Sequence, residues 1–234
     1  MTEMKAALMQ GLPGLGLELE DARCDQLCAF GQAVIRQNEV MNLTAITDPA
    51  QVARLHLLDS LTVLTALNLK DKRVIDVGCG AGFPGVPLKI ACPEMKLTLL
   101  DSLGKRMTWL RENALPELGV EAECLTARAE EAVASRRESY DVATSRAVAR
   151  LNVLLELTAP YVKVGGWVVA MKGSAAAEEL EEAKNSVSKL GLRLERTANF
   201  PLEGTQHTLI LLQKVRPTPA QYPRKFAKIK QSPL

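Results

Sequence analysis

Short apolar runs alternate with amphipathic stretches through the region after Lys72, and this alternation limits the possible folds more than any other feature of the chain. The runs RVIDV, KLTLLD, VEAECLT and YDVATS are short and apolar enough to be buried strands, and amphipathic stretches of helical length separate them. Strands separated by helices of about 10 to 15 residues are typical of a parallel sheet with helices on both faces. We therefore expect an α/β fold with a doubly wound sheet.

The two ends of the chain follow a different pattern. LRLERTANF and HTLILLQK succeed one another with no helix between them, which predicts an antiparallel hairpin at one edge of the sheet. Residues 20–37 and a stretch from about 49 to 67 show helical spacing, and Asp48 is placed to cap the second of these helices. The expected organisation is an N-terminal helical extension over 1–70, a core domain over 71–214 and a basic tail over 215–234. By analogy of fold, such a core resembles the Rossmann-like class I methyltransferases.

Composition excludes several classes of protein. The 234 residues, 47% of them hydrophobic, suffice for one large domain. No apolar stretch approaches the roughly 18 residues of a membrane span, and MTEMKAALMQGLPG lacks the features of a secretory signal, so we expect a cytoplasmic protein with no membrane contact. Five cysteines without metal-type spacing and only two histidines predict no metal site.

Positive charge is concentrated at the C-terminal end. From Lys214 onward there are six basic residues and no acidic one. The remaining 23 basic and 27 acidic residues give the rest of the chain a net charge of −4, against +6 for this segment. Such asymmetry is typical of proteins that contact an anionic polymer such as a nucleic acid. A solvated terminus that promotes solubility is the alternative interpretation.

The segment VIDVGCGAGFPG, residues 74–85, joins the first strand to a helix. Gly78, Gly80 and Gly82 permit positive φ angles and a close approach of a ligand to the backbone. Asp101 ends the second strand about twenty residues further on, where a carboxylate accepts hydrogen bonds from ribose hydroxyls. In open α/β sheets ligands bind at this edge. These features suit both a dinucleotide and S-adenosylmethionine.

Asp76 is the residue that distinguishes between the two candidate ligands. A carboxylate at the mouth of the loop repels a pyrophosphate, whereas it attracts the sulfonium and ammonium groups of S-adenosylmethionine. Asp76 therefore favours S-adenosylmethionine as cofactor. A purely structural role, in which Asp76 caps the loop by accepting backbone N–H groups, is compatible with either ligand.

The stretch ARAEE, residues 127–131, follows the third expected strand, where such folds hold the adenine. A backbone N–H of Ala129 or Glu130 is expected to bind the edge of the base, and Phe83 is a candidate for the apolar contact. The alternative is an ordinary helix start, because acidic residues are favoured in a first helical turn by the helix dipole.

Several motifs carry a resemblance to one known family. They are DVGCGAGFPGVPLKI (76–90), LLDSLGKR (99–106), ARAEE (127–131), SRAV (145–148), NLTAI (42–46), HLLDSL (56–61), MKG (171–173) and YPRK (222–225). Over most of the chain from about Asn42 onward, these motifs resemble the bacterial 16S ribosomal RNA guanine-N7 methyltransferase family, also called glucose-inhibited division protein B. LLDSLGKR together with SRAV is far more specific than the glycine loop.

The resemblance implies methylation at N7 of one guanine in the 530 loop of 16S ribosomal RNA, with S-adenosylmethionine as donor. The cofactor contacts that it implies are Gly78, Phe83, Ala129, Glu130, Arg146 and, at the ribose, Asp101. Cys79 departs from the small hydroxyl residue expected in the loop, and Ala227 replaces a glycine expected shortly after YPRK. The second departure limits how far the tail can be compared.

The implied chemistry agrees with an absence in the sequence. N7 of guanine has a free lone pair and carries no proton, so direct in-line transfer needs no general base. Catalysis then depends on positioning, which contributes about 7 to 11 kcal/mol in favourable cases. The chain shows no obvious acid–base dyad, and this chemistry requires none.

Arginines and lysines are the candidates for catalysis and RNA binding. Arg146, at the end of the fourth expected strand, faces the cofactor or the base and is expected to be essential. Lys105, Arg106 and Lys172 follow other strands and are expected to contact RNA. The tail residues expected to supply affinity are Arg224, Lys225, Lys228 and Lys230.

Three alternatives are open at the level of sequence. A nicotinamide-dependent dehydrogenase is disfavoured by Asp76 and by the lack of a proton-transfer partner. A non-catalytic RNA-binding protein is disfavoured by the intact glycine loop and by Asp101. A methyltransferase of the same fold acting on another RNA site differs only in its target. We expect a monomer whose partner is 16S ribosomal RNA or the small ribosomal subunit.

Overall fold

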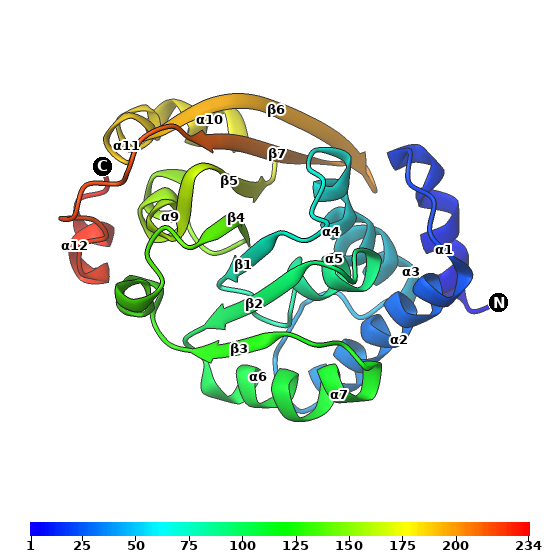
Figure 1. The fold of residues 1–234 in the computed structure, drawn as a ribbon. Coiled ribbons are helices and arrows are strands. Elements are labelled where there is room, and N and C mark those ends of the chain that lie inside the picture. The colour runs from blue at the N-terminus through cyan, green and yellow to red at the C-terminus, as the bar shows by residue number, and fades with distance from the viewer.

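A computed structural model describes all 234 residues and contains one seven-stranded sheet of order β3-β2-β1-β4-β5-β7-β6 (Figure 1). The strands are β1 Arg73–Val77, β2 Lys96–Asp101, β3 Glu123–Thr126, β4 Tyr140–Arg146, β5 Val162–Lys172, β6 Leu192–Leu202 and β7 Thr205–Lys214. The first five strands are parallel, and β7 runs antiparallel to both β5 and β6. The predicted doubly wound sheet with an antiparallel C-terminal hairpin is confirmed.

Helices cover both faces of this sheet. Those of the N-terminal third are α1 Glu3–Gly11, η1 Pro13–Leu15, α2 Asp21–Asn38, α3 Pro49–Val52, η2 Ala53–Leu58, α4 Asp59–Leu61 and η3 Thr62–Thr65. Those between β1 and β4 are α5 Gly85–Ala91, α6 Gly104–Trp109, η4 Leu110–Ala114, α7 Leu115–Leu118, α8 Ala129–Ala132 and η5 Val133–Ser135. The remainder are α9 Leu151–Thr158, η6 Ala159–Tyr161, α10 Ala176–Glu182, α11 Lys184–Lys189 and α12 Phe226–Gln231. No helix has both the length and the apolar character that crossing a lipid bilayer requires.

The N-terminal helices share one hydrophobic core with a face of the sheet. Side chains from α1, α2 and α3 pack in the same cluster as those of α5, α6 and α7. A second cluster, on the opposite face, joins the sheet to α9 and α11. The helix predicted at 20–37 is α2, and the stretch predicted from about 49 to 67 is the run from α3 to η3, where the Asp48 carboxylate accepts a hydrogen bond from the Gln51 N–H at 2.8 Å. The helix α1 is not among those predicted.

The C-terminal segment is folded against the body of the protein. Glu156 of α9 is fully buried, and its carboxylate accepts hydrogen bonds from the backbone N–H, the Nε and the Nη2 of Arg224 at 2.8, 2.8 and 2.6 Å. Arg137 donates to the carbonyl oxygens of Thr218 and Tyr222 at 2.6 and 2.8 Å. Side chains of the body therefore fix the path of the tail up to α12.

Lys214, counted above with the basic segment, is the last residue of β7 and is completely buried. Its ammonium group lies 3.1 Å from the Glu138 carboxylate and donates to the carbonyl oxygens of Ala159 and Val162. Two of the six basic residues, Lys214 and Arg224, thus have buried or partly buried partners inside the fold. The excess of positive charge that faces solvent is smaller than the sequence indicates.

Glu156→Ala should lower the free energy of unfolding by about 3 kcal/mol, because it leaves the partly buried Arg224 guanidinium without its counter-charge. It should also make the segment after Lys214 sensitive to protease. Urea unfolding and limited trypsin digestion measure the two effects. Glu178→Ala, which removes an exposed carboxylate paired with Arg150, is the control and should change stability by no more than about 0.5 kcal/mol. Unchanged stability and cleavage in Glu156→Ala would contradict this anchoring role.

Candidate active site

A cavity of about 1040 Å³ lies at the carboxyl edge of the sheet. The chain leaves β1 toward β2 and later returns to place β4 on the other side of β1, so the two loops diverge at this edge. Such a divergence is where open α/β sheets bind ligands. Residues predicted for the site that line the cavity are Gly78, Gly80, Phe83, Asp101, Arg106, Ala129, Glu130, Arg146 and Lys172.

The glycine loop has the backbone that its sequence predicts. Gly78, Gly80 and Gly82 have φ angles of 73°, 56° and 100°. A Cβ atom at Gly78 would lie 2.4 Å from a methyl group of Val148, so this position also needs the absence of a side chain. The loop is tied to β2 because the N–H groups of Gly78 and Cys79 both donate to the carbonyl oxygen of Leu100.

Asp101 holds the loops of two strands together. One carboxylate oxygen accepts the N–H of Gly80 at 3.0 Å, and the other accepts the N–H of Leu103 at 2.8 Å. Each carboxylate oxygen has two lone pairs, so both retain acceptor capacity toward the cavity. The position and chemistry of Asp101 suit a pair of ribose hydroxyls.

Asp76 lies beneath the glycine loop and is not part of the cavity wall. It is fully buried, Oδ2 accepts the Gly85 N–H at 2.8 Å, and Oδ1 has no hydrogen-bond partner. Burial raises the pKa of Asp76 to about 7, although the Gly85 hydrogen bond opposes this shift. The capping interaction considered for Asp76 is therefore present, and the unpartnered Oδ1 is an acceptor suited to an ammonium group or a water molecule.

Phe83 and Ala129 belong to different parts of the structure. The centre of the Phe83 ring lies about 5 Å from the ring centres of Phe30 and His56 and from the guanidinium carbon of Arg146. Phe83 belongs to the core on the α5 face of the sheet. Ala129 begins α8 and packs against the cores of the opposite side. These contacts place Phe83 under Arg146, and because Phe83 and Ala129 both line the cavity, the contact of Phe83 with an adenine stays a prediction.

Phe226, the first residue of α12, is the aromatic residue of the cavity wall that the sequence analysis missed. Its ring lies 5.8 Å from the guanidinium carbon of Arg128, directly before Ala129. The sequence signal that could have identified Phe226 is its position directly after the motif YPRK. The basic tail therefore contributes a wall to the cavity.

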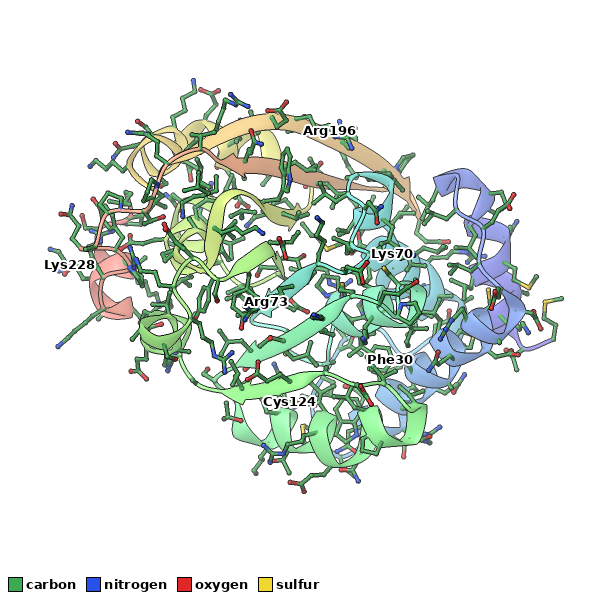
Figure 2. All side chains as sticks on the ribbon, in the orientation of Figure 1. Phe30, Lys70, Arg73, Cys124, Arg196 and Lys228 are labelled. Carbon is green, nitrogen blue, oxygen red and sulfur yellow. The ribbon has the colours of Figure 1, made fainter.

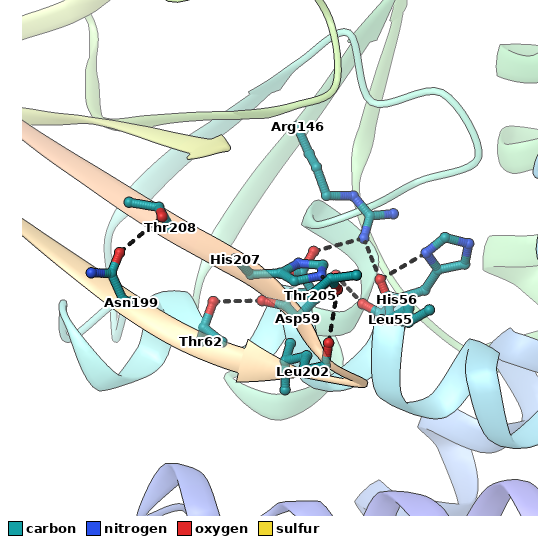
Figure 3. A network of polar contacts seen from close by, with 11 residues as sticks. Leu55, His56, Asp59, Thr62, Arg146, Asn199, Leu202, Thr205, His207 and Thr208 are labelled. Atoms are coloured by element: carbon teal, nitrogen blue, oxygen red, sulfur yellow. Dashed lines mark hydrogen bonds and ion pairs between the residues drawn. The ribbon is translucent and has the colours of Figure 1, made fainter. Parts of the chain in front are cut away.

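A buried carboxylate fixes the orientation of Arg146 (Figure 3). Arg146 Nη1 donates to Asp59 Oδ2 at 3.0 Å and to the Leu55 carbonyl oxygen at 3.1 Å, and His207 Nδ1 lies 2.8 Å from Asp59 Oδ1. Burial alone would raise the pKa of Asp59, but the hydrogen bond from His207 and the charge of Arg146 bring that pKa below its usual range. Both hydrogen bonds of the Arg146 guanidinium use Nη1, so Nε and Nη2 have no protein partner and are available to a ligand.

Both ring nitrogens of His56 have protein partners. Nε2 is 2.8 Å from Thr44 Oγ1, and Nδ1 is 2.9 Å from the Leu55 carbonyl oxygen. Burial, and then the positive charge of Arg146, lower the pKa of His56 to about 4. Its imidazole is thus neutral at physiological pH and has hydrogen-bond partners at both nitrogens.

The cations predicted to contact RNA fall into two groups. Lys105 and Arg106 stand at the start of α6 without an ion pair, and Arg106 donates to the carbonyl oxygen of Asn42 at 2.9 Å. Lys172 is almost enclosed and lies 2.8 Å from the Glu179 carboxylate, which favours a position inside the cavity over a contact with RNA phosphates.

The tail residues divide in the same way. Arg224 is bound by Glu156, whereas Lys225, Lys228 and Lys230 are exposed and form no ion pair. Figure 2 shows Lys228 on α12 at the end of the molecule opposite the N-terminal helices. The exposed tail lysines remain available to an anionic partner.

Comparison with known proteins places this geometry in a family. The family model described as rRNA small subunit methyltransferase G matches residues 23–209. Proteins named ribosomal RNA small subunit methyltransferase G are similar along the whole chain. That of Alkaliphilus metalliredigens is 41% identical over 238 residues, covering 99% of each chain, and that of Acetivibrio thermocellus is 40% identical over 237 residues, covering 99% of this chain and 97% of its own.

Solved structures show the same fold at low sequence identity. A SAM-dependent methyltransferase from Aquifex aeolicus has a TM-score of 0.53 and 18% identity, with 71% of this chain and 94% of that chain covered. The mitomycin 7-O-methyltransferase has a TM-score of 0.57 and 18% identity, with 80% and 60% covered. The full-length similarity shows that this chain belongs to the rRNA small subunit methyltransferase G family, and its fold is the one found in S-adenosylmethionine-dependent methyltransferases.

Proposed function

We propose that this protein transfers a methyl group from S-adenosylmethionine to N7 of one guanine in the 530 loop of 16S ribosomal RNA. One observation carries the proposal: seven of the eight motifs of the family resemblance contribute residues to the same cavity. These seven motifs are spread over residues 42–173, and only YPRK, next to the cavity residue Phe226, is absent from the wall. A shared chemical task explains why such distant segments converge.

The residues of the cavity fit the proposed cofactor. Asp101 offers acceptors to the ribose, and the backbone at Ala129 and Glu130 lies where the adenine is expected. The unpartnered Oδ1 of Asp76 suits the positively charged methionine end, through a water molecule because Asp76 is not in the wall. When bound, S-adenosylmethionine supplies a methyl group on a sulfonium centre.

The transfer that we propose moves no proton. The N7 lone pair forms the new N–C bond while the electrons of the S–C bond return to sulfur. The titratable groups around Arg146 agree with this chemistry, because His56 and Asp59 already have partners at their polar atoms. Asp59 and the Leu55 carbonyl oxygen hold Arg146 in place, and positioning of the reactants contributes about 7 to 11 kcal/mol in favourable cases.

The direct test is transfer of labelled methyl to small ribosomal subunits and to naked 16S RNA, both lacking the modification, followed by mapping of the labelled nucleoside. The proposal predicts 7-methylguanosine in the 530 loop. Label at another nucleotide would support the methyltransferase activity but refute the proposed target nucleotide. No label in either RNA would refute the proposed activity.

Arg146→Ala should reduce methyl transfer at least 100-fold in a folded protein, because Arg146 lines the cavity with guanidinium donors that have no protein partner. Single-turnover methylation measures the loss, and circular dichroism checks the fold. Arg36→Ala, which removes an exposed arginine of α2 that pairs with Glu117 of α7 outside the cavity wall, is the matched control and should retain full activity. Near-normal transfer by Arg146→Ala would remove this arginine from the site.

Asp101→Asn should weaken S-adenosylmethionine binding about 10- to 100-fold. Both carboxylate oxygens accept backbone N–H groups, so an amide NH₂ would face one of these donors and disturb the ribose contact. Isothermal titration calorimetry with S-adenosylhomocysteine provides the measurement. Asp71→Asn, a surface substitution in the turn before β1, should bind as the unchanged protein does; equal affinity of the two variants would argue against the ribose contact.

Lys228→Ala combined with Lys230→Ala should weaken RNA binding and flatten its salt dependence. Each lost phosphate contact lowers the slope of log K against log salt by about 0.7 to 0.9. Binding to small-subunit RNA at several salt concentrations measures this slope. Lys184→Ala, on α11 and paired with Glu181, should leave the slope unchanged. An unaltered slope in the double variant would show that α12 does not contact phosphates.

A further inference from the structure

Glu179 and Lys172 form an almost enclosed ion pair in the wall of the cavity. Glu179 belongs to α10 and Lys172 ends β5, and their side chains are 13% and 7% exposed. Oε2 of Glu179 accepts the N–H of Leu151 at 2.7 Å and lies 2.8 Å from the Lys172 ammonium, which also donates to the carbonyl oxygen of Ala149. These contacts fix the carboxylate against the start of α9.

The other oxygen of this carboxylate is free. No hydrogen bond reaches Glu179 Oε1, and it is not sealed from solvent, because the enclosed side-chain oxygens that lack a partner belong to Asp76 and Thr144. Of the other carboxylates that line the cavity, Asp59 has protein partners at both oxygens, Asp101 lies at the expected ribose site and Glu130 lies at the expected adenine site. A fixed carboxylate with one open acceptor is a typical means of recognising a ligand N–H group.

The order of strands places this acceptor on the substrate side. Asp101 ends β2 and Ala129 follows β3, so the expected ribose and adenine sites lie on one side of β1. Arg146 ends β4 and Lys172 ends β5 on the other side, with Met171 paired to Arg146 in the sheet. A base that approaches the methyl group opposite the adenosine therefore meets Arg146 first, then Lys172, then Glu179.

Guanine presents matching groups in the same order. Next to N7 comes the acceptor O6, which suits an ammonium or guanidinium group, and then the donors N1–H and N2–H₂, which suit a carboxylate oxygen. Adenine has a donor in place of O6 and an acceptor at N1, so it opposes both members of the pair. Bases splayed out of RNA are commonly recognised through this edge.

We propose that Glu179 selects guanine by accepting its N1–H and N2–H₂ groups through Oε1, with Lys172 directed to O6. This inference rests on the proposed function, because it takes N7 as the methylated atom. The negative charge of Glu179 also favours the reaction, since the purine becomes cationic as N7 is methylated.

Glu179→Gln is a specific probe of this role. Both neighbours of Oε2, the Leu151 N–H and the Lys172 ammonium, are donors, so the glutamine carbonyl must face them. Its NH₂ group then occupies the place of Oε1 and opposes the donors of guanine. Glu182→Gln is the matched control, because Glu182 lies on the same helix, is exposed, pairs with Arg150 and is outside the cavity wall.

The experiment uses 16S RNA ligated from two pieces, so that the nucleotide labelled by the unchanged enzyme can be either guanosine or inosine. Inosine lacks the N2–H₂ group. Single-turnover rates are measured for the unchanged enzyme, Glu179→Gln and Glu182→Gln. We expect the unchanged enzyme and Glu182→Gln to prefer guanosine about 10- to 100-fold, and Glu179→Gln to lose this preference. Comparing enzymes cancels any difference in the intrinsic reactivity of N7.

A structural role for Glu179 predicts a different result. If Glu179→Gln slows both RNAs equally and keeps the preference, Glu179 only supports α9 and the inference is wrong. If Glu179→Gln has the same rates and the same preference as the unchanged enzyme, the inference is also wrong. If the unchanged enzyme forms no 7-methylguanosine in the guanosine RNA, the proposed function fails first, and the inference fails with it. Titration with S-adenosylhomocysteine confirms that each variant is folded and binds the cofactor product.

Discussion

The contact between Asp59 and Arg146 unites the parts of the chain that form the cavity. Asp59 comes from the N-terminal helices, Arg146 from the end of β4, and His207, the second partner of the carboxylate, from the C-terminal hairpin. A buried carboxylate is stable only when charges and hydrogen bonds compensate for its lost hydration, so these three elements depend on one another. Figure 3 shows how the hairpin reaches over the helix that carries Asp59.

A second buried carboxylate has the same effect at the other end of the cavity. Glu156 binds Arg224 and thereby directs the tail toward α12, whose Phe226 enters the wall beside Arg128. The basic tail is consequently both an exposed surface and part of the site. The exposed lysines of α12 thus lie next to the expected adenine position, where our proposal places the contacts of the tail with RNA.

The sequence predicted best those features that depend on local pattern. The alternation of apolar runs indicated the parallel strands, and the absence of a helix before HTLILLQK indicated the hairpin, because periodicity and turn chemistry act over a few residues. Gly78, Gly80 and Gly82 were recognised for the same reason: their positive φ angles follow from a tight strand-to-helix turn. Asp101 was also identified correctly as a cavity residue, because its place at the end of a strand is a local feature of the sequence.

Contacts between residues that are far apart in the chain could not be predicted from the sequence. The sequence by itself determined the order of strands and helices, the glycine loop and the family motifs. Only the tertiary structure decided that Phe83 lies under Arg146, that Asp76 is sealed below the loop, and that Lys172 pairs with Glu179. The physical reason is that burial and ion pairing depend on which segments the sheet brings together. Identical lysines therefore become a buried counter-charge at Lys214 and a solvent-exposed cation at Lys228.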